Sequence, residues 1–254
     1  MPGVEKPDQD WEQFGKSDPY FAVITAERYH KGRLNQQDQD AFYQSGEEYV
    51  QGVLSTIREH FAAEFNPARV LDFGCGVGRL TIPLARVAET VTGVDVSPAM
   101  LDLARARAAQ IGLHNIEFTH SDDALSALSG KYDLILSSLV FQHIPPARGE
   151  KIFRRLLGYL NPGGICVVQF LYRRPHQRFY RCYYWLRQHV PFFKHAANVL
   201  QGRPVSAPFM QMNPYDMNRL LAIIQEAQGR EVFCQLEEDE GFESVTVIVE
   251  RYNQ

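Results

Sequence analysis

The sequence predicts a single α/β domain with a doubly wound, mostly parallel seven-stranded sheet and a C-terminal antiparallel hairpin. Two observations lead to this fold class. Between residues 68 and 172, short apolar segments alternate with helical segments, which is the pattern of βαβ units. Near the C-terminus, two alternating segments flank Gly241, as in an antiparallel hairpin. Right-handed crossovers would then place helices on both faces of the sheet.

The individual elements follow from the apolar spacing and from residues that begin and end helices. Strands are expected at residues 68–74, 90–96, 116–121, 132–140 and 164–172, with a hairpin over 230–252. Helices are expected at residues 46–65, 79–88, 97–112, 150–160 and 213–229. The helix over 97–112 has the clearest ends, because Ser97 can cap it, Pro98 suits its first turn and Gly112 can end it.

The same pattern divides the chain into four parts. A polar and aromatic arm covers residues 1–45, and the alternating core covers 46–170. An aromatic and basic insert covers residues 171–213, where the strand–helix rhythm breaks. A helix and hairpin over 214–254 would complete the sheet.

Composition indicates an ordinary globular chain. Apolar residues make up 45% and charged residues 22% of the sequence. No run of about 18 apolar residues suggests a membrane span, and the polar N-terminus is unlike a secretory signal. Cys75, Cys166, Cys182 and Cys234 have no short paired spacing, so we expect neither a zinc site nor disulfides. We expect a cytoplasmic protein without a metal site.

Charge is distributed unevenly along the chain. The net charge is −4, yet no Asp or Glu lies between Glu150 and Asp216, where ten Lys and Arg residues occur. This asymmetry predicts a surface that meets something anionic. Within it, one helical face carries Phe179, Tyr183, Leu186 and Val190. Four interpretations stay open: a lid that collects an anionic substrate, contact with a membrane surface, contact with RNA, and plain packing on the sheet.

A glycine-rich turn carries the clearest chemical signal. Gly74, Gly76 and Gly78 form G-x-G-x-G directly after an apolar strand and before a helix. Glycines there let the backbone turn tightly and approach a ligand closely. Asp95 ends the next strand about 20 residues later, where a carboxylate can accept both ribose hydroxyls. The combination predicts a nucleoside ligand.

Two residues separate this turn from a nicotinamide dinucleotide site. Arg79 stands where the dinucleotide fingerprint has its third glycine. Asp72 lies two residues before Gly74, and its carboxylate would repel a pyrophosphate. The same carboxylate could hold an ammonium group or a sulfonium-bearing methionine group. A nicotinamide oxidoreductase is therefore disfavoured.

These segments resemble the class I methyltransferases. LDFGCGVGRLTIPLA is similar to the first motif of that family, GVDVSPAMLDLAR to the next, and HSDDALSALSGKYDLILSSLVFQHIPP to the two after it. LNPGG resembles the turn before strand five, so the likeness covers about residues 45–170. The resemblance implies a Rossmann-like fold, S-adenosylmethionine as cofactor and S-adenosylhomocysteine as product. WEQFGKSDPYFAVITAERY also resembles an arm that covers the cofactor in some bacterial members.

The resemblance assigns residue roles by position. It implies that Asp95 grips the ribose, that Asp122 reaches the adenine amino group and that the strand ending at Ser138 lies beside the methionine group. The cofactor residues are then Asp72, Gly74, Gly76, Gly78, Asp95, Val96, Asp122, Asp123 and Ser138. Asp123 is an adjacent rival of Asp122, which could instead cap a helix. Gly78 could serve helix packing alone.

His143 is the candidate catalytic residue. It follows strand four, at the carboxyl edge where open α/β sheets bind ligands. Its ordinary pKa would suit a general base for a hydroxyl acceptor, and the alternative is a structural histidine.

The function expected from this resemblance is methyl transfer to an oxygen of a small or medium-sized acceptor, such as a sugar, a glycolipid or a natural-product hydroxyl, with nitrogen the less favoured attacked atom. Methylation of RNA or another anionic substrate stays open, with nucleic acid the less favoured partner. So does a protein that binds S-adenosylmethionine without turnover of its own.

Overall fold

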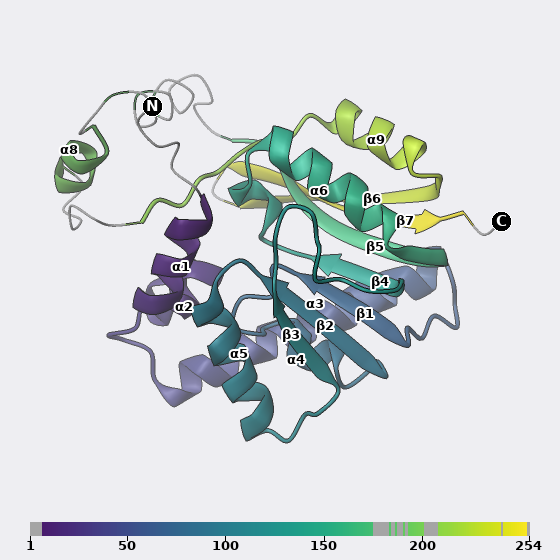
Figure 1. Ribbon diagram of the computed structural model, residues 1–254, viewed down its shortest axis with the longest axis horizontal. Coiled ribbons are helices and arrows are strands. Elements are labelled where there is room, and N and C mark those ends of the chain that lie inside the picture. Colours follow the sequence, from purple (N-terminus) through teal and green to yellow (C-terminus); the bar gives the residue numbers. More distant parts are fainter. Residues whose placement is uncertain are drawn as a thin grey trace.

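The seven strands form one sheet in the order β3-β2-β1-β4-β5-β7-β6 (Figure 1). The computed structural model describes residues 7–174, 183, 186, 190, 193–200, 208–239 and 241–252. The strands are β1 Arg69–Phe73, β2 Thr90–Asp95, β3 Ile116–His120, β4 Tyr132–Ser137, β5 Leu160–Arg173, β6 Gly229–Asp239 and β7 Phe242–Arg251. Strand β7 pairs antiparallel with β5 and β6, and the other four pairings are parallel. The predicted fold class is therefore confirmed.

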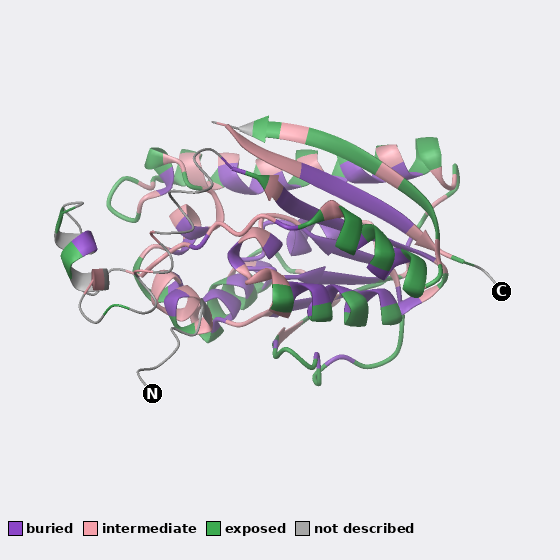
Figure 2. Ribbon diagram, turned by 90° about the horizontal axis from the view of Figure 1, so that it is seen from above, coloured by how far each residue is buried: buried purple, intermediate pink, exposed green. Residues whose placement is uncertain are grey.

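The central strands are buried on both faces, as their nearly continuous apolar runs indicate. Leu134, Ile135 and Leu136 of β4 are fully buried, and Val70 and Leu71 of β1 pair with this strand. Figure 2 shows this buried band running through the middle of the sheet. The carboxyl ends of the parallel strands consequently meet along one rigid edge.

Helices cover both faces of the sheet. On one face, α3 (Gln36–His60) inserts Val50, Leu54 and Ile57 against β1, β4 and β5. On the other face, α6 (Pro146–Gly158) and α9 (Met217–Glu226) pack against β4, β5 and β7. In Figure 1, α6 and α9 lie in front of the sheet, and α3 is fainter behind it.

The N-terminal arm is built from three short elements that pack beside α5 (Pro98–Gln110). These are α1 (Pro7–Ser17), α2 (Pro19–Val23) and the 3₁₀ turn η1 (Glu27–Tyr29). Tyr29 and Phe42 are fully buried at the centre of this cluster, where their rings meet edge to face. The cluster also includes Val77, Ile82 and Met100, so the arm packs on the core through shared apolar contacts.

Two helices differ most from their predicted bounds. Helix α3 begins at Gln36 instead of residue 46, because the Asn35 side chain caps it by accepting from the Asp38 amide at 2.9 Å. The boundary drawn at residue 45 thus falls inside α3. The helix predicted over 79–88 contracts to α4 (Thr81–Leu84), followed by turns. The cap and stop predicted for α5 are confirmed at Ser97 and Gly112.

Two further elements complete the described chain, the 3₁₀ turn η2 (Phe141–His143) and α8 (Phe193–Leu200). Most of the helix expected around Phe179 and Tyr183 lies outside the described residues. None of the helices in the described ranges is long and apolar enough to span a membrane.

Candidate functional site

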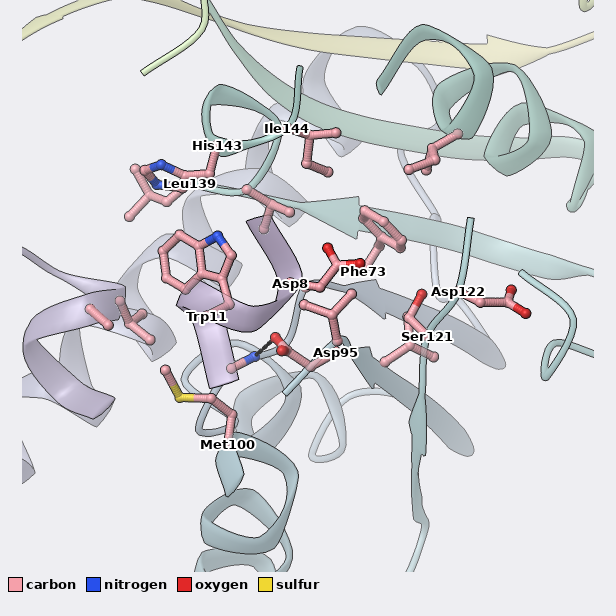
Figure 3. Close-up of a pocket in the computed structure, with 18 of the residues that line it drawn as sticks. Asp8, Trp11, Phe73, Asp95, Met100, Ser121, Asp122, Leu139, His143 and Ile144 are labelled. Atoms are coloured by element: carbon pink, nitrogen blue, oxygen red, sulfur yellow. Dashed lines mark hydrogen bonds between the residues drawn. The ribbon is translucent and has the colours of Figure 1, made fainter. Parts of the chain in front are cut away.

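A pocket lies along the carboxyl edge of β1, β2, β3 and β4, and the N-terminal arm forms one side of it (Figure 3). About 800 Å³ of space lies between its walls, and this figure includes open solvent. Most of its wall is apolar, with Phe73, Val140 and Ile152 among the lining side chains. Eight residues predicted for the site line it: Gly74, Gly76, Asp95, Val96, Asp122, Asp123, Ser138 and His143.

The glycine turn brings bare backbone to the pocket surface. Gly74 and Gly76 have φ of 77° and 52°, in the left-handed region that favours glycine. A Cβ atom on Gly74 would lie 2.4 Å from Cγ2 of Val140, so a side chain has no room there. Gly78 also has a positive φ, but its nearest neighbour is Cβ of Ala104 in α5, at 3.4 Å, and it lies outside the pocket lining.

Asp95 is held rigidly at the end of β2. Its Oδ2 accepts the Gly76 amide and its Oδ1 accepts the Ser97 amide, each at 2.9 Å. Burial raises the pKa of Asp95, and these backbone donors counteract that effect. Figure 3 shows the carboxylate facing the pocket beside the glycine turn. The arrangement presents fixed acceptor oxygens to a ligand.

Asp72 lies behind the turn and does not line the pocket. The residue is 2% exposed, and its carboxyl group accepts the Thr81 hydroxyl at 2.6 Å. Burial raises its pKa to about 6. Asp72 thus supports the glycine turn from below while keeping a negative charge close to it near neutral pH.

The two candidate adenine residues, Asp122 and Asp123, are exposed. Figure 3 shows Asp122 at the far end of the pocket from Trp11. Asp122 caps the following turn, because its Oδ1 accepts the Ser126 amide at 2.9 Å. Hydrogen bonds from Ser126 lower its pKa. Asp123 instead pairs with Arg148 at 2.6 Å. Asp122 therefore occupies the capping position that its sequence context left open.

His143 is buried in the wall opposite Asp95. Its Nδ1 lies 2.7 Å from the Gln211 carbonyl and so donates to it, which leaves Nε2 as the acceptor of the ring, where the Gln142 amide nitrogen can donate. Nε2 lies 3.3 Å from the Gln142 amide nitrogen, and the ring packs against Trp11 with centroids 4.8 Å apart. Burial lowers the pKa of His143 to about 4, so the ring is neutral at physiological pH.

The arm contributes pocket residues that sequence reasoning did not identify. Asp8 and Trp11 of α1 line the pocket. Arg148 at the start of α6 donates to both oxygens of Asp8, at 2.7 and 2.9 Å, while it also pairs with Asp123. This bridge fastens α1 over the pocket. The only sequence signal was the resemblance of the arm to one that covers a cofactor.

A buried polar relay behind Ser138 was also missed. The Oε1 atom of Gln169 on β5 accepts the Ser138 hydroxyl at 3.2 Å and the Leu139 amide at 3.0 Å. Its Nε2 donates to Glu237 of β6 at 2.8 Å. Leu139 has a φ of 62°, so the relay holds a strained residue in the pocket wall. A glutamine inside an otherwise apolar strand was the available signal.

The chain is similar in sequence to known methyltransferases. Residues 70–164 match the family model described as a methyltransferase domain. Ubiquinone biosynthesis O-methyltransferase from Roseobacter denitrificans is 37% identical over 112 residues, which is 44% of each chain. The enzyme of that name from Bartonella tribocorum is 34% identical over 130 residues, 47% of this chain and 52% of its own. The chain spans about half the length of the curated relatives it matches.

A solved structure extends the likeness to the whole fold. Magnesium protoporphyrin IX methyltransferase from Synechocystis PCC 6803, solved with bound S-adenosylmethionine, superposes with a TM-score of 0.64. The alignment covers 99% of this chain and all of that one, at 18% identity. The family model, the glycine turn and the strand order all indicate a methyltransferase domain. Residues 70–164 therefore match a methyltransferase domain, and they lie on a seven-stranded, Rossmann-like sheet.

Proposed function

We propose that this protein is an S-adenosylmethionine-dependent O-methyltransferase that acts on a small or medium-sized hydroxyl acceptor. One observation carries the proposal: the glycine turn and Asp95 face one pocket, within the segment that matches the methyltransferase family model. The curated relatives named O-methyltransferases support oxygen as the attacked atom.

The pocket fits S-adenosylmethionine on its own geometry. Gly74 and Gly76 bring backbone without side chains to the pocket lining, and Asp95 offers fixed acceptors for ribose hydroxyls. Val96 and Met100 supply apolar wall for the nucleoside, with Asp122 and Asp123 at its outer end. Ser138 and the glycine turn would then lie at the methionine end, and Asp72 behind it.

The protein contributes positioning and exclusion of water. The bound cofactor supplies a sulfonium methyl group, and transfer breaks its sulfur–carbon bond, forms an oxygen–carbon bond and releases the hydroxyl proton. The Arg148 bridge holds α1 and Trp11 over the pocket, which limits access of water to the reacting atoms. The fixed wall from Ser138 to His143 orients an acceptor.

His143 acts in this proposal by accepting a hydrogen bond. Its Nδ1 donates to the Gln211 carbonyl, so Nε2 is the ring atom that can accept from the acceptor hydroxyl, which would replace the Gln142 amide there. With a pKa of about 4 it is a weak base, better suited to orienting the hydroxyl than to removing its proton before transfer.

The acceptor class is argued from the distribution of charge along the chain. The stretch with ten basic residues and no acidic ones favours an anionic acceptor, such as a glycolipid or a sugar with a charged group, and contact with a membrane surface. The cysteine spacing favours a cytoplasmic location.

Calorimetric titration with S-adenosylhomocysteine tests the cofactor site directly. Asp95→Ala removes the acceptors at the end of β2 and is expected to weaken binding at least tenfold. Asp102→Ala on the exposed side of α5 is the matched control and should bind like the wild type. Equal binding by the wild type and Asp95→Ala would contradict the assignment. Binding without turnover across a panel of hydroxyl acceptors would favour a partner protein, and salt-sensitive binding of RNA would favour RNA methylation.

A further inference from the structure

Glu12 of the N-terminal arm reaches from α1 to the start of α5. Its Oε2 accepts the Ser97 hydroxyl at 2.7 Å and the Ala99 amide at 3.2 Å, while its Oε1 pairs with Lys16 at 2.9 Å. Burial raises the pKa of Glu12, but the hydrogen bonds from Lys16, Ser97 and Ala99 outweigh that effect and lower it. The arm therefore presents a carboxylate to the first turn of α5.

This carboxylate completes a helix cap that Ser97 provides only in part. The first amides of a helix have no partner within the helix. The Ser97 hydroxyl accepts the Met100 amide at 3.2 Å, and the Ala99 amide donates to Glu12 instead. The helix dipole also favours a negative charge at this position. The start of α5 is consequently held from outside by a residue of the arm.

The close approach of α1 to α5 depends on Gly15. A Cβ atom on Gly15 would lie 2.5 Å from Oγ of Ser97, so no other residue fits there without displacing that hydroxyl. Gly15 follows Glu12 by about one helical turn, which places both on the same face of α1. Glycine destabilises a helix interior relative to alanine, so this contact accounts for its presence. Figure 1 shows α1 beside α5.

Ser97 connects this contact to the ribose end of the pocket. Its amide donates to Oδ1 of Asp95 at 2.9 Å, while its hydroxyl donates to Glu12. Ser97 is fully buried, so it cannot shift without moving both partners. Only one further backbone amide, that of Gly76, donates to Asp95. A displacement of Ser97 would therefore change one of the two backbone contacts that hold the Asp95 carboxylate.

We propose that Glu12 is a positioning residue for the ribose site, which acts through Ser97 on the orientation of Asp95. The inference rests on the proposed cofactor and adds a residue of the arm to its binding. Glu12 and Ser97 are not among the residues that line the pocket, so the effect on the ligand passes through Asp95. Docking of the arm and binding of the ribose are then coupled, and each strengthens the other.

Two ligands that differ only in the ribose hydroxyls test this role. S-adenosylhomocysteine carries both hydroxyls, and its 2′,3′-dideoxy analogue lacks them. Glu12→Ala removes the acceptor of Ser97 and leaves the pocket lining intact. We expect about 3- to 10-fold weaker binding of S-adenosylhomocysteine and unchanged binding of the analogue, both measured by calorimetry. Glu12→Gln keeps an acceptor oxygen and should lose less.

A second measurement needs no ligand. The amides of Gly76 and Ser97 both donate to Asp95, so their hydrogen exchange reports how firmly that carboxylate is held. In Glu12→Ala we expect both amides to exchange about tenfold faster than in the wild type, as measured by NMR. Gly15→Ala should show the same faster exchange and the same selective loss of affinity, because its Cβ displaces the Ser97 hydroxyl.

Gln9→Ala is the matched control, since Gln9 is an exposed residue of the same helix and does not line the pocket. It should leave both affinities and both exchange rates unchanged. Equal weakening of the two ligands by Glu12→Ala would show that Glu12 only docks the arm, and would overturn the inference, as would unchanged binding of both. If Glu12→Ala does not fold, the ratio of the two affinities in Gly15→Ala decides. A wild-type protein that binds neither ligand would instead refute the cofactor itself.

Discussion

Replacing Gly74 by Ala tests the glycine turn quantitatively. The new Cβ would lie 2.4 and 2.7 Å from the two Cγ atoms of Val140, on a backbone with φ of 77°. Left-handed backbone costs an alanine about 1–2 kcal/mol, and overpacking in a tight site costs about 1–3 kcal/mol. We therefore expect Gly74→Ala to lower the free energy of unfolding by about 2–5 kcal/mol.

Two further variants separate these contributions. Gly112 has a φ of 73°, but a Cβ atom added there would have no neighbour within 4 Å, so Gly112→Ala should cost only the backbone strain, about 1–2 kcal/mol. Adding Val140→Ala to Gly74→Ala removes both clashing Cγ atoms. The overpacking part of the loss should then reappear as a favourable coupling energy between the two substitutions. Urea unfolding of the variants and the wild type measures each free energy. The reasoning would be refuted if Gly74→Ala were no more destabilising than Gly112→Ala, or if Val140→Ala recovered nothing.

Three other predictions follow from the pocket. Because the pKa of His143 is lowered to about 4, the unfolded chain binds more protons than the folded chain between about pH 6.5 and 4. The free energy of unfolding should therefore fall by about 3 kcal/mol as the pH drops through that window. His143→Gln should remove this pH dependence, as measured by urea unfolding. The pH dependence due to Asp72 has the opposite sign, because its pKa is raised to about 6. The free energy of unfolding should fall as the pH rises from about 4 to 6, and Asp72→Asn should abolish that fall. A variant that keeps the fall would contradict the assignment. Arg148→Met should raise the rate of amide hydrogen exchange in residues 7–17 at least tenfold, whereas the control Arg105→Met should not. Equal exchange rates in Arg148→Met and the wild type would show that the bridge does not hold α1.

The relay behind Ser138 can be broken without touching the pocket lining. Gln169→Leu fills the same space but leaves the Leu139 amide and the Glu237 carboxylate without their shared partner. We expect a loss of about 1–3 kcal/mol in stability, with a smaller loss for Glu237→Gln, which can still accept from the Gln169 amide. Urea unfolding measures both, and a neutral Gln169→Leu would show that the relay does not constrain the wall.

Local patterns suffice for the sheet and for part of the site. Gly74 and Asp95 can be predicted because the turn, the strand before it and the strand after it are close in sequence, and their spacing alone implies a shared edge. The cap at Ser97 and the stop at Gly112 are equally local. Helix α3 begins earlier than predicted because its first turns are polar, and the spacing of apolar residues therefore does not reveal them. Asn35 is the one local signal of this start, since it is a good capping residue.

Contacts between distant segments are beyond such patterns. Asp8 and Arg148 are 140 residues apart, and nothing in either segment indicates the other. The Gln169–Glu237 contact joins two strands whose pairing passes through β7, so its register depends on the whole hairpin. In the sequence, Arg79 stands out only as a departure from a dinucleotide fingerprint. Its Nε has no hydrogen-bond partner among the described residues, which can be known only once α3 packs against it.

The most direct test of the central claim is transfer of label from methyl-labelled S-adenosylmethionine to an extract of the source organism. Extraction then divides the products into organic-soluble molecules, small aqueous solutes and precipitated macromolecules. The account predicts label in an organic or small aqueous product with the wild-type protein, and its loss with Asp95→Ala. Wild-type label no higher than that of Asp95→Ala would contradict it.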